Sequence, residues 1–151
     1  MSLKQSPSRT ALEAAQAATR LARQVALALG DLDLSPSQYR LLLFLSEGNA
    51  AASAVAGRLA VSRPSVTALA DGLEKRGLLQ RKSDPTDRRR VAHELTDAGR
   101  GTLAAADAAM ADHIVRIARC LDADQADRAL AGLALWNQAL TLARNQRESQ
   151  Q

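Results

Sequence analysis

The chain has few aromatic residues and a single cysteine. Phe, Trp and Tyr together make up 2% of its 151 residues, and Cys120 is the only cysteine. One cysteine excludes an intrachain disulfide, and we interpret Cys120 as a small buried hydrophobic residue rather than a redox sensor. The sequence shows no signal peptide and no apolar run of about 18 residues, so we expect a cytoplasmic protein without a membrane span.

Residue patterns that many enzymes share are also missing. The sequence has no Ser/His/Asp arrangement, no glycine-rich phosphate loop and no paired metal ligands. Two histidines and one cysteine, well separated in sequence, do not make a metal site. We therefore expect neither catalytic activity nor a metal or other cofactor.

Alanine and leucine dominate the hydrophobic residues, which make up 46% of the chain. Both are strong helix formers, so the composition favours an α-rich fold with a core of small side chains. Because helices packed in this way bury little area within one chain, we expect pairing with a second subunit.

Positive charge is concentrated in one segment. The whole chain carries a formal charge of +4, whereas residues 58–90 contain nine lysines or arginines against four acidic residues, a local charge of +5. The remainder of the chain is therefore close to neutral. Such a local excess is typical of a surface that binds a polyanion.

Helical periodicity and capping residues predict two helices in the first third of the chain. The first covers residues 9–29. The second begins at Ser35, where Pro36 fits the first helical position and Gln38 completes a capping box, and it ends at Gly48.

Residues 53–76 have the form of a helix-turn-helix. Two short helices are predicted, over about residues 53–60 and 63–76, with a tight turn between them. Ser62 is suited to cap the second helix, and Gly77 to end it in the left-handed conformation. Three apolar residues of this second helix are spaced to face inward: Val66, Leu69 and Leu73.

After Gly77 the helical spacing of apolar residues ends. Residues 78–82 and 90–95 are short enough for strands, and Asp84-Pro85 marks a turn between them. The loop is longer than a two-residue hairpin turn, so its tip projects. The run Arg88–Arg90 lies on this tip and at the base of the returning strand.

The last third of the chain is predicted to be two long helices. Thr96 caps the first, of about 22 residues. Asp122 with Gln125 forms a capping box at the start of the second, which reaches about residue 145. Apolar residues recur along the first at spacings of three and four, which suits packing against another helix. These residues are Leu103, Ala106, Met110, Ile114, Ile117 and Leu121. The second helix is predicted from Leu130, Leu133, Asn137 and Leu140.

A helix-turn-helix followed by a basic hairpin is a winged helix, so the expected fold class is mostly α with a small β-hairpin wing. The major groove of DNA is about 12 Å wide and admits one α-helix. The second helix of the motif is the element that fits there, with its N-terminus toward phosphate. The candidate contacts on this helix and its cap are Ser62, Arg63, Ser65, Thr67 and Ala68.

The hairpin tip is suited to a minor groove, where narrow A·T-rich sequence attracts arginine. This explains why Arg88, Arg89 and Arg90 lie together on a projecting loop. We interpret Asp87 as a carboxylate that orients the guanidinium of Arg89. Arg81 and Lys82, on the preceding strand, are either phosphate contacts or surface charges that keep the chain soluble.

From about Leu34 to Arg100 the sequence resembles the MarR family of bacterial transcriptional regulators. The resemblance rests on LAVSRPSVTALADGLEKRGLLQRKSDPTDRRR, with its DxRR wing signature, and on ELTDAGR, which opens a long helix. It implies a homodimer with interlocked N- and C-terminal helices and two winged helices placed on a palindrome. It also implies that Arg89 is the minor-groove arginine and Asp87 its partner.

The resemblance divides the chain into three parts. Residues 1–34 form an N-terminal dimerisation helix, 35–99 the winged helix-turn-helix domain, and 100–151 the C-terminal dimerisation helices. The function expected is that of a dimeric, sequence-specific regulator, a ligand-responsive repressor that binds double-stranded DNA at a pseudo-palindromic operator. Since relatives hold small aromatic acids near the dimer helices, Tyr39 and Arg40 are candidate effector contacts. The alternative is a winged-helix protein–protein adaptor with a degenerate DNA face.

Overall fold

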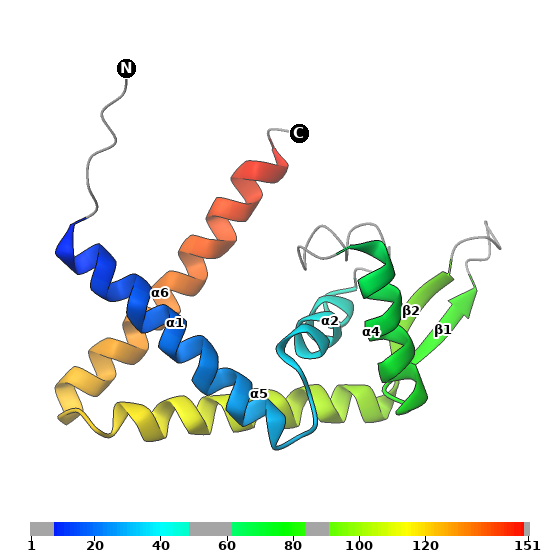
Figure 1. The fold of residues 1–151 in the computed structure, drawn as a ribbon, viewed down its shortest axis with the longest axis horizontal. Coiled ribbons are helices and arrows are strands. Elements are labelled where there is room, and N and C mark those ends of the chain that lie inside the picture. The colour runs from blue at the N-terminus through cyan, green and yellow to red at the C-terminus, as the bar shows by residue number, and fades with distance from the viewer. Residues whose placement is uncertain (1–7, 49–61, 84–90, 150–151) are drawn as a thin grey trace. The chain divides into compact units, whose positions relative to one another are not determined.

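The computed structural model describes residues 8–48, 62–83 and 91–149. Two compact units divide the chain, one up to Met110 and the other from Ala111 onward. The elements, in chain order, are α1 (Arg9–Gly30), α2 (Pro36–Ser46), α4 (Arg63–Lys75), β1 (Leu79–Ser83), β2 (Val91–Leu95), α5 (Asp97–Ala118) and α6 (Ala123–Glu148) (Figure 1). None of the helices in the described ranges is long and apolar enough to cross a membrane. The predicted helix at about residues 53–60 lies outside the described residues.

The predicted helix ends follow from local hydrogen bonds. At the start of α2, the Ser35 hydroxyl accepts from the backbone N–H of Gln38 at 3.2 Å, and the Gln38 side chain accepts from the backbone N–H of Ser35 at 2.8 Å. This reciprocal pair confirms the predicted capping box. Helix α2 then ends at Ser46, and Gly48 turns the chain with a positive φ of 84°.

Strands β1 and β2 form an antiparallel hairpin. Their register runs from the pair Leu79–Leu95 to the pair Ser83–Val91, and it places Arg81 opposite His93. The predicted first strand, 78–82, is shifted by one residue from the observed one, and the predicted second strand, 90–95, starts one residue too early and ends correctly at Leu95. The mostly helical fold with a two-stranded wing is therefore confirmed.

The hydrophobic core of the first unit lies between α1, α2, α4, the hairpin and the start of α5. Leu29, Leu41, Leu42 and Leu73 are fully buried. Helix α4 lies alongside the hairpin and packs on both α2 and β1 (Figure 1). Its inward residues follow the predicted spacing, since Val66 and Leu73 are buried and Leu69 is partly buried.

A small joint connects the end of α4, strand β1 and the start of α5. Gly77 has a φ of 71°, a conformation that glycine adopts without strain. The Thr96 hydroxyl donates to the Gly77 carbonyl at 2.6 Å and accepts from the backbone N–H of Gly99 at 3.0 Å. Gly99 is buried directly against the Leu78 carbonyl, where a Cβ atom would lie 2.0 Å from the oxygen. Thus Thr96 caps α5, as predicted, and Gly99 permits the close approach.

The second unit contains the end of α5 and all of α6. Asp122 caps α6 by accepting from the backbone N–H of Gln125 at 2.8 Å, which is one of the two hydrogen bonds of the predicted capping box. The helix continues past the predicted residue 145 to Glu148. Large apolar side chains are exposed in the single chain here, namely Ile117, Leu121, Leu133, Leu135, Trp136, Leu140 and Leu142. The expectation that Cys120 is buried is wrong for the single chain, because this residue is exposed in the turn that follows α5.

Candidate nucleic-acid interface

The N-terminus of α4 is capped by serine and faces solvent. The Ser62 hydroxyl accepts from the backbone N–H of Ser65 at 3.3 Å and lies 2.8 Å from the Ser65 hydroxyl. Pro64, the second residue of α4, has no backbone N–H to leave unsatisfied in the first turn. The first turn therefore presents hydroxyls and backbone N–H groups, the groups that bind phosphate at helix N-termini.

The predicted major-groove contacts lie on the outer face of α4. Ser62, Ser65, Thr67 and Ala68 are exposed, whereas Val66 and Ala70 are buried against the body of the unit. Arg63 is the first residue of α4, and its side chain lies outside the described residues. Asp87, Arg88, Arg89 and Arg90 also lie outside them.

Arg81 is engaged with two carboxylates of α4. Its Nε donates to Oε2 of Glu74 at 2.9 Å, and its Nη2 donates to Oδ1 of Asp71 at 2.8 Å. The hydrogen bond and charge of Glu74, followed by the weaker effects of Asp71, raise the pKa of Arg81 above its ordinary value. The three side chains together carry a charge of −1, so the two carboxylates more than neutralise the positive charge of Arg81.

His93, opposite Arg81 on β2, is half-buried beside this group. Its pKa is lowered, chiefly because burial disfavours the charged imidazolium and secondly because Arg81 is cationic, while Glu74 and Asp71 oppose the shift. His93 is therefore neutral at pH 7, and it adds no positive charge to this part of the hairpin.

A second arginine, Arg76, attaches the C-terminal end of α4 to the turn between α1 and α2. Arg76, which caps the C-terminus of α4, donates from Nη1 to the Asp33 carbonyl at 2.6 Å and from Nη2 to the Leu32 carbonyl at 3.4 Å. Asp33 has a positive φ of 54°, an uncommon conformation for a residue with a side chain. Arg76 thus fixes α4 to the turn between α1 and α2.

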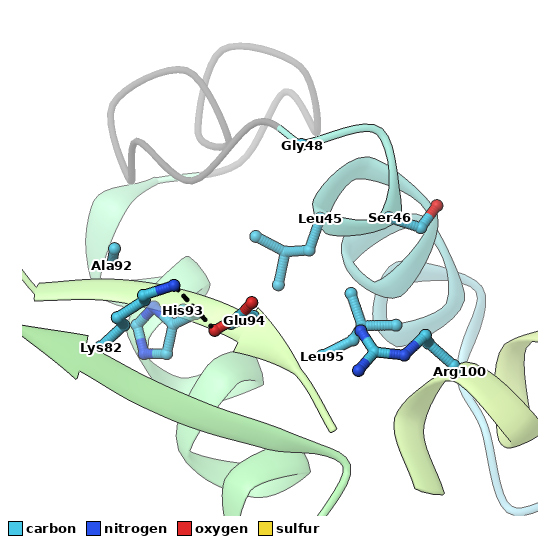
Figure 2. Close-up of a pocket in the computed structure, with 9 residues that line it drawn as sticks. All are labelled: Leu45, Ser46, Gly48, Lys82, Ala92, His93, Glu94, Leu95 and Arg100. Atoms are coloured by element: carbon cyan, nitrogen blue, oxygen red, sulfur yellow. Dashed lines mark ion pairs between the residues drawn. The ribbon is translucent and has the colours of Figure 1, made fainter. Parts of the chain in front are cut away.

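A cavity of about 290 Å³ opens between the end of α2, strand β2 and the start of α5. Figure 2 shows Lys82 and Glu94 facing each other on one side and Arg100 on the other. Nζ of Lys82 lies 3.4 Å from Oε2 of Glu94. Both cations already have a carboxylate partner, since Arg100 pairs with Asp97 at 2.9 Å. The chemistry of these walls therefore indicates no particular ligand.

The two predicted effector contacts do not meet in this cavity. Tyr39 is half-buried and donates from its hydroxyl to Oδ1 of Asp107 at 2.7 Å. Burial first, and then the hydrogen bond and charge of Asp107, raise the pKa of Tyr39 well above its ordinary value of 10.0. Arg40 is exposed and donates to the Ser37 hydroxyl at 3.4 Å. Among the described residues, no cluster of His, Cys, Asp and Glu is suited to hold a metal ion.

The ion pairs on α4 were not anticipated from the sequence. Asp71 and Glu74 are three residues apart, which places both on one side of a helix, and this spacing was the available signal. Nothing in the sequence pairs them with Arg81 rather than with a neighbouring cation, because that choice depends on how α4 packs against the hairpin.

Comparison with known proteins gives the same fold. The family model MarR_2, described as MarR family, matches residues 32–90. The transcriptional repressor CouR, solved bound to a 23-mer DNA duplex, is 35% identical over 84% of this chain and 89% of its own, with a TM-score of 0.63. YusO from Bacillus subtilis is 25% identical over 85% of this chain and 92% of its own, with a TM-score of 0.69. No protein with a curated description matches the chain.

The fold likeness extends to MarR from E. coli in its apo form. This protein is 19% identical over 89% of the chain and 98% of its own, with a TM-score of 0.70. At that identity the likeness concerns the fold alone. Because the similar region is nearly the whole of each solved chain, the likeness includes the flanking helices as well as the winged helix.

Proposed function

Because the chain belongs to the MarR family of transcriptional regulators, we propose that it is a dimeric, sequence-specific DNA-binding protein. In this proposal it acts as a ligand-responsive repressor at a pseudo-palindromic operator, without catalytic activity. The observation that carries the proposal is the pairing of α4, with its exposed and serine-capped N-terminus, with a hairpin whose connecting segment contains Arg88–Arg90.

In the proposed complex, α4 enters the major groove and the hairpin tip follows the adjacent minor groove. The exposed face of α4 includes Ser65, Thr67 and Ala68, and the major groove is wide enough to admit one α-helix. Phosphate contacts at the first turn fix the position of the helix, whereas side chains that reach base edges read the sequence. The residues proposed for the two grooves are Ser62, Arg63, Ser65, Thr67, Ala68, Asp87, Arg88, Arg89 and Arg90.

Exposed apolar side chains support the proposed dimer. In the second unit Trp136 is 62% exposed and Leu140 is 65% exposed, and both belong to α6. Large apolar side chains exposed on a protein surface mark interaction sites, so these residues of α6 support a protein–protein contact. A second copy of the chain is the partner proposed, since a twofold dimer presents two identical winged helices to a palindrome.

The proposal includes a direction of regulation, which is repression, and an effector, which is an aromatic acid. CouR, described as a repressor, supports repression by its similarity to this chain. The aromatic-acid effector, with Tyr39 and Arg40 as its contacts, stays a prediction from the sequence. An acid that binds the dimer better than the DNA complex would release the DNA by shifting the population.

Selection of duplexes from a random-sequence pool tests the proposed function. We expect the wild-type protein to enrich a sequence with inverted half-sites about one helical turn apart. The affinity for that duplex should fall steeply as salt is raised, because bound phosphates release their counterions. Failure to retain any duplex at low salt would contradict DNA binding and favour the protein–protein adaptor.

A further inference from the structure

The contact between Arg81 and α4 joins the two elements that are proposed to meet DNA. Arg81 lies in the middle of β1, two residues before the strand ends and the segment 84–90 begins. Its two carboxylate partners lie in the second half of α4, eight and eleven residues after the helix starts. The guanidinium uses two different nitrogens, one for each carboxylate, and this fixes its orientation more firmly than a single ion pair would.

The surroundings of Arg81 do not suit a phosphate contact. The side chains of Asp71 and Glu74 are 42% and 34% exposed, and both carboxylates contact Arg81. A phosphate bound to Arg81 would therefore lie next to two negative charges. The group of Asp71, Glu74 and Arg81 has a charge of −1, and the neighbouring His93 is neutral at pH 7. A phosphate placed here would be repelled by the group as a whole.

We propose that Arg81 is a positioning residue: it fixes strand β1 to α4 and so sets the spacing between the recognition helix and the wing. This inference rests on the proposed function, since the spacing matters only if both elements bind one duplex. The helix and the hairpin must fit successive grooves whose separation is fixed by the DNA. Loss of the contact frees the outer part of the hairpin, beyond the buried pair Leu79–Leu95, to shift relative to α4, and so lowers specific affinity.

Arg76 gives the helix a second, independent attachment. Its hydrogen bonds to the Leu32 and Asp33 carbonyls hold the C-terminal end of α4 to the turn before α2. With that end fixed by Arg76, the contact of Arg81 acts on the hairpin rather than on the helix. The inference is therefore specific to the wing.

Neutral variants of the carboxylates separate positioning from phosphate contact. The double variant Asp71→Asn/Glu74→Gln removes two negative charges and releases Arg81. If Arg81 positions the hairpin, this variant binds the duplex selected by the wild type about tenfold more weakly, despite its added positive charge. A scrambled duplex of equal length should be bound as tightly as by the wild type, or more tightly, because that binding is electrostatic.

The variant Arg81→Gln gives the complementary measurement. We expect the same loss of specific affinity, with the slope of log K against log salt unchanged from the wild type. Combining Arg81→Gln with the carboxylate variant should cause no further loss, since all three changes remove one contact. A phosphate contact would instead lower the salt slope by about one and weaken both duplexes alike.

Two controls complete the experiment. Arg128→Gln removes an exposed arginine that pairs with Asp124 at 2.7 Å within α6, so it measures the effect of one charge alone. Arg81→Lys keeps the positive charge but cannot bind both carboxylates through two fixed nitrogens. It replaces Arg81→Gln in the experiment if thermal unfolding shows that Arg81→Gln does not fold. If Arg81 is a positioning residue, Arg81→Lys loses specific affinity.

Two results would overturn the inference, and they differ from each other. Tighter or unchanged binding of the selected duplex by Asp71→Asn/Glu74→Gln would refute positioning while leaving the proposed function intact. Failure of the wild-type protein to bind any duplex would remove the proposed function and the inference together.

Discussion

The hydroxyl of Tyr39, on α2, donates a 2.7 Å hydrogen bond to Oδ1 of Asp107, on α5, although the two residues are 68 positions apart in the sequence. This bond joins a helix of the winged-helix body to the long helix that leads into the second unit. A phenol held against a carboxylate can lose its proton only by placing two negative charges side by side, and its partial burial opposes ionisation as well.

Tyr39 should therefore ionise at higher pH than a free phenol. Because it is the only tyrosine, absorbance of tyrosinate during an alkaline titration follows this group alone. The unfolded chain loses this proton near pH 10.0, whereas the folded chain retains it, so stability is complete below pH 10 and declines as pH rises above it. Asp107→Asn should lower the midpoint only in part, since burial is the larger cause. A wild-type midpoint at the ordinary value would contradict the contact.

Gly99→Ala should destabilise the protein. A Cβ atom at this position would lie 2.0 Å from the Leu78 carbonyl oxygen, which is backbone and cannot turn aside. We expect a loss of about 1–3 kcal/mol in the free energy of unfolding, measured by chemical denaturation. Gly101→Ala is the matched control, because that glycine lies on the same helix with nothing within 4 Å of its added Cβ.

Alanine at position 101 should leave stability unchanged or raise it by about 0.5–1 kcal/mol, since alanine favours helix more than glycine does. Equal effects of the two substitutions would show that the close approach of α5 to Leu78 does not form.

The residues of this joint show which parts of the structure the sequence predicts. The caps at Ser35, Ser62 and Thr96 depend on partners three residues away, so a short stretch of sequence contains the whole signal. The order of helices and strands in the winged helix is also predicted from short stretches of sequence, because each element is indicated by its own local pattern. The requirement for glycine at position 99 is different, since it arises from the backbone of Leu78, and only the packing of α5 reveals it.

Long-range polar contacts were beyond sequence reasoning for the same reason. The sequence alone predicts Arg81 either as a phosphate contact or as a surface charge, and it offers many carboxylates as partners. The choice of Asp71 and Glu74 follows from the packing of α4 against β1. The exposure of Cys120 likewise depends on where α5 ends, two residues earlier, rather than on the apolar neighbour that suggested burial.

Trp136 should report dimer formation. It is the only tryptophan and is 62% exposed in the single chain, so burial in a dimer would shift its fluorescence to shorter wavelength. Leu140→Glu places a charge among the exposed apolar residues of α6, and we expect it to raise the dissociation constant of the dimer about tenfold or more. Dilution series by fluorescence and sedimentation velocity measure this constant.

Gln138→Glu provides the control for that experiment, since it adds the same charge to an exposed polar position of α6. It should change dimerisation much less than Leu140→Glu. A monomer at all accessible concentrations, with the emission of an exposed tryptophan, would refute the dimer.

Arg89→Ala tests the wing through the residue that the DxRR signature singles out. A guanidinium that enters a narrow minor groove is desolvated and contacts both its walls, so its loss should weaken binding of the selected duplex by about 1–3 kcal/mol. Arg128→Ala removes the same charge from an exposed position of α6 and should have little effect. Asp87→Ala should also weaken binding although it removes a negative charge, because the carboxylate is expected to orient Arg89. Tighter binding by Asp87→Ala would show instead that this carboxylate only repels DNA.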